Sequence, residues 1–557
     1  MGRRREKAPK RVENNLSIRW LVLILLAMGT FFCFVFGDIL SPVKSLLETA
    51  KGWDSRAFGT YAGALSFVNV FFFFLIFAGI ILDKMGARFT LIIAGMILIT
   101  GAVINWYAVT EAFIRSELAV WFNHHLNYIP VFDELGVSPF YRGMPASAKL
   151  ASIGFMIFGC GSEIVGIAVA RGITKWFKGK ELALALSLNM AIGRLGLATC
   201  MIFSPLIANI SILGSADVSN SAAFGAMLLM ITVVLFIAFY VVDKKSSALF
   251  VEAEEKGDPF KLGDIGRILS NRNFWLVALL CVFYYSAIVP FQKYAVNVLE
   301  CNLNFMPLPT DSFWASGTVI TGQYFLMIAA AAAAFSSNFF QKKVKTLLFI
   351  ISLCFIAVLC FLTFKQQSAG AVFSIYPLLA VCITPALGNY IDRKGKAVTL
   401  LIFGSGLLIV CHLAFAFILP LFRGSEVGGF LLSYVVILLL GASFSLVPAS
   451  LWSSVPKLVD KKVFGTTYAL IFWIQNIGVW LFPILIGRIL IASNTGVAEQ
   501  LALGLITPDE AAVMYNYTNP LILLACLGVV SLLLSIVLKI TDRKKCLGLE
   551  LPNIKQA

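Results

Sequence analysis

Charged residues are scarce in this chain. They make up only 13% of its 557 residues, while hydrophobic residues make up 59% and the mean hydropathy is +0.89. A soluble domain typically contains about 25% charged and about 45–50% apolar residues, so a soluble fold could not cover this much apolar surface. Intrinsic disorder is excluded by the same numbers, because it requires low hydrophobicity and high charge. The composition therefore indicates a polytopic membrane protein.

Several catalytic and structural patterns are also missing. Of the 11 cysteines, only Cys301 falls in an expected outer loop, which excludes a disulfide scaffold. No Walker loop of the form GxxxxGK[ST] occurs, which argues against a built-in ATP motor. His124 and His125 have no cysteine or carboxylate at zinc spacing around them. We therefore expect no enzyme activity, no metal site and no cofactor.

The net charge of +15 has a distribution that does not fit a nucleic-acid binder. Lysine and arginine collect in short clusters between apolar runs, as the positive-inside rule of membrane proteins produces. The main clusters are Arg3-Arg4-Arg5, Lys175–Lys180, Lys342–Lys345 and Arg543-Lys544-Lys545. No A-x-A-like site follows the first apolar run, so we expect no cleavable signal. The expected surroundings are the lipid bilayer and a small-molecule substrate, without nucleic acid.

Runs of roughly 20 apolar residues predict about 14 membrane-spanning helices. Helices are expected because open sheet edges cannot face lipid. The expected spans are 18–40, 57–82, 88–109, 150–172, 181–207, 220–242, 273–298, 312–336, 344–364, 369–391, 397–420, 427–452, 464–491 and 517–540. Basic loops all fall on one side if both termini are cytoplasmic, while the loops 110–149, 299–311, 421–426 and 492–516 fall outside.

One polar segment, 243–272, is expected to be a cytoplasmic linker that divides the chain. It separates an N-terminal region, residues 1–242 with the long outer loop 110–149, from a C-terminal region, residues 273–540. Residues 541–557 are expected to form a cytoplasmic tail.

Two of the expected inner loops share a pattern of glycine, three residues, aspartate, a cation, one residue, glycine and a further cation. They are Gly79-Ile-Ile-Leu-Asp83-Lys84-Met-Gly86-Ala-Arg88 and Gly388-Asn-Tyr-Ile-Asp392-Arg393-Lys-Gly395-Lys396. The aspartate can cap a neighbouring helix, the second glycine permits a tight turn, and the cations face the cytoplasm. One copy could be an ordinary basic hairpin loop, whereas two copies in corresponding places indicate a duplicated transporter.

The doubled loop resembles the signature of the major facilitator superfamily, which lies between its second and third and its eighth and ninth helices. The second copy fits this position if the spans 312–336 and 344–364 are an inserted pair after the seventh helix. The resemblance then covers nearly the whole chain. It implies an all-α membrane fold of two six-helix bundles, here with an inserted helix pair.

Further motifs resemble the lysosomal dipeptide transporter branch of that superfamily. They are Phe32-Cys33 with Asp38, Cys281-Val-Phe-Tyr284-Tyr285 with Pro290-Phe291, and Gly465-Thr466 with Gln475-Asn476-Ile477-Gly478. The ExxER motif of proton-coupled peptide transporters is missing from the first span. The resemblance implies dipeptide substrates moved by facilitated diffusion, and it allows an accessory subunit. The inserted pair and the outer loop 110–149 depart from this branch.

Glu163 and Arg194 are expected in the middle of the antiparallel spans 150–172 and 181–207. An ionisable group at that depth costs at least about 2.5–3.5 kcal/mol and marks function by default. A salt bridge that only fixes helix packing is the alternative, although a buried ion pair contributes little net stability. Arginine can bind a carboxylate through two hydrogen bonds, and glutamate can bind an ammonium group. The resemblance implies that an acid and an arginine at these positions bind the two ends of a peptide.

The other candidates for the substrate site carry less evidence. Asp38 could line the cavity or cap a helix, and the tyrosines Tyr284, Tyr285 and Tyr376 could form its walls or only pack. His412 could be a proton site or a core histidine. Candidates from the second half are Trp452, Trp473, Gln475 and Asn476.

We interpret the chain as a secondary transporter that moves dipeptides or related small zwitterions by alternating access, as a uniporter. The loops Asp83–Arg88 and Asp392–Lys396 would latch the cytoplasmic side of the outward-facing state. A proton-coupled organic-anion transporter, with Glu163 titrating, is one alternative. A membrane sensor or assembly protein without transport is another. We expect a bacterial cytoplasmic membrane, with the lysosomal membrane as the alternative.

Overall fold

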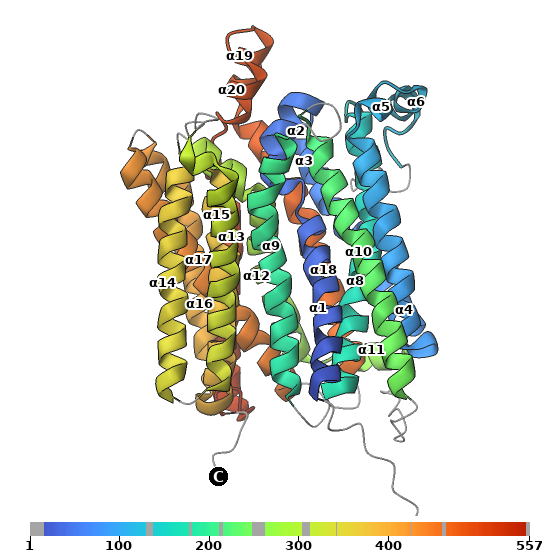
Figure 1. The fold of residues 1–557 in the computed structure, drawn as a ribbon, viewed down its shortest axis with the longest axis vertical. Coiled ribbons are helices and arrows are strands. Elements are labelled where there is room, and N and C mark those ends of the chain that lie inside the picture. Colours follow the sequence, from blue (N-terminus) through green and yellow to red (C-terminus); the bar gives the residue numbers. More distant parts are fainter. Residues whose placement is uncertain are drawn as a thin grey trace, which may run out of the picture.

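The computed structural model describes residues 16–129, 138–177, 181–210, 216–247, 262–303, 312–340, 342–423, 425–458 and 464–552, and no strand occurs within these ranges. Thirteen of the described helices are long and apolar enough to cross a membrane, or 14 if one bent pair counts as a single span. This agrees with the number expected from hydropathy, and the long helices run side by side (Figure 1).

The first bundle contains α1 (Leu16–Gly37), α3 (Ser55–Phe72), α4 (Phe74–Ala108), α8 (Ala146–Phe177), α9 (Leu182–Ala208) and α10 (Val218–Ser247). The second contains α12 (Arg272–Asn302), α15 (Ala369–Lys394), α16 (Ala397–Leu413), α17 (Glu426–Leu458), α18 (Phe464–Ser493) and α21 (Thr518–Lys545). The bundles meet where α3 packs along α18 and α9 packs along α15. This is the architecture of the major facilitator fold, as expected.

The inserted pair consists of α13 (Gly317–Ser336) and α14 (Lys342–Gln366), which follow α12 and precede α15. The pair packs on α15 and also reaches the first bundle. The ring of Tyr324 lies edge-on to Phe203 of α9, with centroids 5.3 Å apart. The ring of Phe339, after α13, lies 6.1 Å from Trp20 of α1. The inserted pair therefore touches both bundles.

The second span is not the single straight helix that 57–82 predicts. It breaks at Phe73, whose φ is +51°, and α3 and the start of α4 are bent by 73° there. A left-handed residue interrupts the helical hydrogen bonds, and the Trp473 indole on α18 donates to the carbonyl oxygen of Val70 at 3.0 Å. The partner for this freed carbonyl comes from the opposite bundle.

The two ends of the molecule differ in what covers them (Figure 1). Short helices gather at the upper end, which we call the capped end: α2 (Lys44–Lys51), α5 (Glu111–Ile114), α6 (Glu117–His125), α19 (Thr495–Ala502) and α20 (Pro508–Ala512). We call the lower end, where α1 begins and α21 ends, the basic end. The short helix α11 (Leu262–Leu269) lies there, within the segment expected to be a linker.

Candidate functional site

Glu163 lies on α8 and faces the second bundle. Its Oε1 accepts a hydrogen bond of 3.1 Å from the side-chain amide of Asn476 on α18. The oxygen of the same amide accepts a bond of 2.8 Å from Ser66 of α3. The carboxylate is therefore bonded across the interface between the bundles, by a neutral partner.

Arg194 lies on α9 and also reaches across that interface. Its Nη1 donates to the hydroxyl of Thr384 on α15 at 2.6 Å. The guanidinium carbon lies 4.4 Å from the centroid of the Phe444 ring on α17, within the range of a cation–π interaction. Both partners are neutral, and both belong to the second bundle.

Glu163 and Arg194 do not pair with each other. Among the described residues, no ion pair within 4.0 Å joins these two side chains. The structure thus lacks the salt bridge that would explain the two charges by helix packing alone. Two opposite charges with neutral partners at one interface can accept the opposite charges of a ligand.

The three tyrosines proposed as pocket walls lie around Arg194. All three lie near its guanidinium group, and the fully buried Tyr376 ring packs on Phe444, the ring that Arg194 faces, with centroids 5.4 Å apart. Tyr284 is fully buried and donates to the carbonyl oxygen of Ser443 at 2.9 Å, which holds it within the second bundle. Tyr285 is only partly buried, so its ring is the one most open to a ligand.

Asp38 is part of an ion pair that sequence reasoning missed. Its Oδ1 lies 2.8 Å from the Nζ of Lys293 on α12, and the two side chains are 13% and 6% exposed. The same ammonium donates to the carbonyl oxygen of Gly37 at 2.6 Å. This pair ties α1 to α12 and hence one bundle to the other. The rule that singled out Glu163, an ionisable residue within an apolar span, would also have found Lys293.

Other contacts near the capped end also cross between the bundles. A Cβ added at Gly59 of α3 would lie 2.4 Å from the carbonyl oxygen of Pro483 on α18, so only glycine permits this approach. The hydroxyl of Tyr515, just before α21, bonds to the carboxylate of Glu48 on α2. The interface is therefore closed toward the capped end.

We call the two repeated loops, Gly79–Arg88 and Gly388–Lys396, the first and second gating loops after their predicted role. The first is held within its own bundle. Arg88 lies 2.8 Å from the carboxylate of Asp243 near the end of α10. That carboxylate also pairs with Lys175 at 3.0 Å. Gly86 has a φ of +73° and makes the turn inside α4, while the side chain of Asp83 lies outside the described residues. Of the remaining members, Gly79 is half-buried and Lys84 is exposed.

The second gating loop is covered by a segment that sequence reasoning did not implicate. Gly395 has a φ of +74° and is buried, with the backbone of residues 550–552 against it. The backbone N–H of Lys396 donates to the carbonyl oxygen of Glu550 at 3.0 Å. Three other members of the loop are half-buried or exposed: Gly388, Asp392 and Arg393. We call residues 546–552, which follow α21, the tail.

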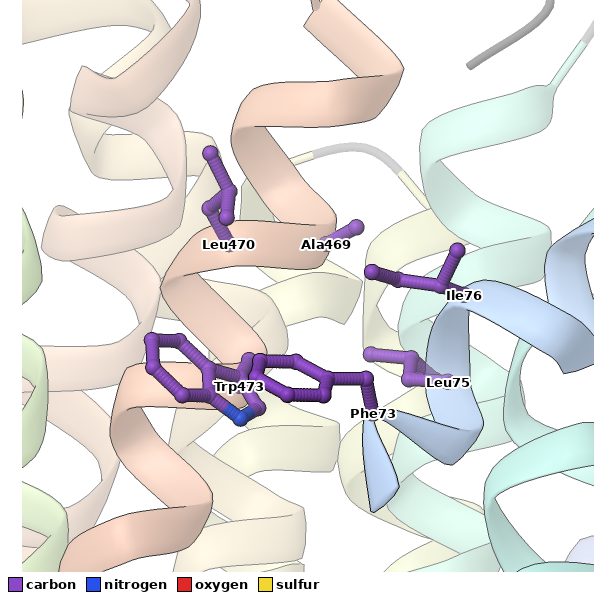
Figure 2. Close-up of a pocket in the computed structure, with 6 residues that line it drawn as sticks. All are labelled: Phe73, Leu75, Ile76, Ala469, Leu470 and Trp473. Carbon is purple, nitrogen blue, oxygen red and sulfur yellow. The ribbon is translucent and has the colours of Figure 1, made fainter. Parts of the chain in front are cut away.

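An apolar recess marks the break in the second span (Figure 2). The ring of Trp473 stacks on Phe73 with centroids 5.1 Å apart. The recess is lined by Phe73, Leu75, Ile76, Ala469, Leu470 and Trp473. Trp473 thus joins α18 to the bent pair of helices, and its indole N–H donates to the Val70 carbonyl oxygen.

Most of the remaining candidates contact residues of their own half of the chain. The two ring nitrogens of His412 lie 2.9 and 3.0 Å from the carbonyl oxygens of Leu408 and Ala287. The ring of His125 stacks on Trp121, and His124 is exposed. Two further contacts join helices of the second bundle: Trp452 donates to Tyr285 at 2.9 Å, and the side-chain oxygen of Gln475 lies 3.1 Å from the Cys281 sulfur. No group of three metal-ligating side chains occurs in the described part of the chain.

Sequence comparisons agree with this architecture. The family model for the Major Facilitator Superfamily matches residues 135–368. The lysosomal dipeptide transporter MFSD1 of Homo sapiens is 22% identical over 489 residues, which cover 86% of this chain and 81% of that protein. The Danio rerio protein of the same name is 23% identical and covers 86% of this chain and 82% of its own length.

Solved structures show the same fold at low identity. The nucleoside transporter NupG superposes with a TM-score of 0.56 and 13% identity, over 94% of this chain and 99% of that chain. A bacterial homolog to the human lysosomal transporter Spinster, in an inward-facing and occupied conformation, gives a TM-score of 0.58 and 11% identity, over 95% and 99%. The chain therefore shares the fold of these transporters, matches the Major Facilitator Superfamily model over residues 135–368, and resembles the lysosomal dipeptide transporter MFSD1 at low identity.

Proposed function

We propose that the chain is a secondary transporter that moves dipeptides or related small zwitterions across a membrane by alternating access, as a uniporter. The observation that carries the proposal is the placement of Glu163 and Arg194. They have opposite charges, they do not pair, and each is bonded to a neutral group of the opposite bundle.

A zwitterion would satisfy both charges at once. Its ammonium group would bind the Glu163 carboxylate in place of the Asn476 amide, and its carboxylate would bind the Arg194 guanidinium in place of the Thr384 hydroxyl. Since the two ligand charges and the two protein charges balance, no obligatory proton is required. Tyr285, the only partly buried tyrosine of the three, would line the space beside Arg194.

The distribution of contacts supports a conformation that is closed at the capped end. Asp38–Lys293 and the α3–α18 packing join the bundles there, whereas Arg88 at the basic end bonds within one bundle. Rocking of the bundles would break the Asp38–Lys293 pair and bring the two gating loops together. By the positive-inside rule the basic end, where α1 begins and α21 ends, would face the cytoplasm.

One observation favours the alternative of a proton-coupled organic-anion transporter. The Asn476 amide that bonds to Glu163 is neutral, and no described cation pairs with this carboxylate, so no counter-ion opposes its neutralisation by a proton. In that mechanism Arg194 alone would bind the anion. Uptake of an organic anion that follows an imposed pH gradient, without any peptide, would select this alternative.

The names of the matched relatives bear on the compartment. They are lysosomal transporters in animals, which supports the lysosomal membrane over the bacterial membrane that the sequence alone favoured. Fluorescence microscopy of the tagged chain against a lysosomal marker tests this. Co-purification from the same cells tests for an accessory subunit.

Reconstitution into liposomes tests the proposed activity. We expect saturable uptake of alanyl-alanine. Glu163→Gln and Arg194→Ala should each lower this uptake about 10²-fold or more. Each substitution removes the charge-assisted hydrogen bonds to one end of the ligand, which are worth about 3 kcal/mol in total. Glu499→Gln, on the exposed helix α19, is the matched control. Normal uptake by both site variants would place the site elsewhere. A folded wild-type protein that moves no solute would favour the sensor.

A further inference from the structure

The two bundles end at the basic end in the same way. Asp243 near the end of α10 is followed by Lys244 and Lys245, and Asp542 near the end of α21 is followed by Arg543 and Lys544. Both aspartates are buried, at 1% and 6% exposed. The repeat that produces two gating loops therefore also produces two buried carboxylates beside them.

The two loops nevertheless use these carboxylates differently. In the first loop the residue two positions after Gly86 is Arg88, whose side chain reaches Asp243 at 2.8 Å. In the second loop the residue two positions after Gly395 is Ala397, which has no side chain for such a contact. The second loop thus lacks the group that fastens the first.

The tail contacts the second loop instead. The Glu550 carboxylate accepts hydrogen bonds from the backbone N–H of Thr399 at 2.8 Å and from its hydroxyl at 3.1 Å. The Glu550 carbonyl oxygen accepts a bond from Lys396. A Cβ added at Gly395 would lie 2.2 Å from that oxygen, so the loop and the tail are in direct backbone contact.

The Glu550 carboxylate caps the helix that follows the second loop. α16 begins at Ala397, directly after the left-handed residue Lys396, which makes no side-chain cap. The first N–H groups of a helix have no partner within it and attract negative charge. Glu550 supplies that cap from 151 positions further along the chain.

The tail is itself anchored to two other helices of the second bundle. Leu549 is fully buried, and its N–H donates to Asp542 of α21 at 2.9 Å. Lys457 of α17 donates to the carbonyl oxygens of Leu551 at 2.8 Å and Gly548 at 3.1 Å. The tail therefore links the second loop to α17 and α21, as Arg88 links the first loop to α10.

We propose that Glu550 is the positioning residue of the second gating loop, where it takes the place that Arg88 holds at the first. The inference rests on the proposed transport function, because the loops act as gates only in an alternating-access carrier. Glu550 does not touch the substrate site. Its loss changes how the loop Asp392–Lys396 is held, and hence the rate of interconversion of the two states.

The test compares Glu550→Ala and Glu550→Gln with the wild type in two measurements. Hydrogen exchange of the peptide spanning residues 395–400 reports the docked loop without any substrate. We expect Glu550→Ala to accelerate that exchange about fivefold, the effect of losing a typical N-cap, and Glu550→Gln to restore part of the protection. In liposomes we expect a several-fold change in the turnover of alanyl-alanine at an unchanged KM.

Deletion of residues 546–557 should reproduce the exchange result, and Glu499→Gln should leave both measurements unchanged. Unaltered exchange at 395–400 in Glu550→Ala would overturn the proposal. A change in KM without a change in turnover would also overturn it, because that pattern belongs to a binding residue. If the wild type moves no dipeptide while the exchange result holds, the proposed transport function fails and the docking of the tail stands.

Discussion

The two bundles contribute unlike chemistry to the shared interface. The first bundle supplies both candidate ligand-binding charges, Glu163 and Arg194. The second bundle supplies their neutral partners, which are an amide, a hydroxyl and an aromatic ring. A charge needs a well-fixed environment, whereas neutral partners can be exchanged for a ligand at small cost. If Glu163 and Arg194 bind the substrate as proposed, recognition would reside in the first bundle, and the second bundle would respond to whether the site is filled.

Lys293 is the exception, because it is a charge of the second bundle. Lys293→Ala should have the largest effect on stability of the variants outside the substrate site, since breaking a buried ion pair costs about 3–5 kcal/mol. The double variant Asp38→Asn with Lys293→Ala should recover most of the loss, because no buried charge is left unpaired. Thermal unfolding of the purified proteins measures both. A double variant no more stable than Lys293→Ala would contradict this account.

The neutral partners of the second bundle should matter less than the charges of the first. Thr384→Val and Asn476→Ala should each change uptake of alanyl-alanine by at most about tenfold, because each removes one hydrogen bond of about 0.5–1.5 kcal/mol that the ligand itself displaces. Initial rates in liposomes give the answer. A loss as large as that of Arg194→Ala would remove the distinction between the bundles.

The smallest effect is expected at the break in the second span. Trp473→Phe keeps a ring stacked on Phe73 but removes the donor to the Val70 carbonyl. We expect faster hydrogen exchange in residues 70–76, by about threefold to tenfold, with little change in uptake. Exchange equal to that of the wild type would show that this bond does not hold the bend.

Much of the fold could be predicted because its signals are local. Apolar runs define the spans, and the doubled loop fixed the place of the inserted pair, as the helices α13 and α14 confirm. The charges at Glu163 and Arg194 were visible for the same reason. Their roles in binding stay predictions, because no ligand contact tests them.

The features that were missed depend on distant or unsignalled contacts. No glycine or proline lies at the break at Phe73, so the sequence carries no residue type that predicts it. Thr399, which bonds to the Glu550 carboxylate, lies 151 positions away, and no spacing rule connects a tail carboxylate to the start of a helix. Asp38 was singled out, but its partner Lys293 is 255 positions further along the chain and only the folded structure brings them together.

The inserted pair makes the two seams between the bundles unequal toward lipid. Along α9 and α15, the rings of Tyr324 and Phe339 rest on the first bundle, so acyl chains meet protein there. The described helices of the inserted pair pack on α15 and α9, and not on α3 and α18, where the recess beside Trp473 lies. If the chain is the carrier proposed above, an amphiphile that dissolves in the bilayer would reach the interface more readily along α3 and α18, and bilayer composition would act on the two flanks unequally.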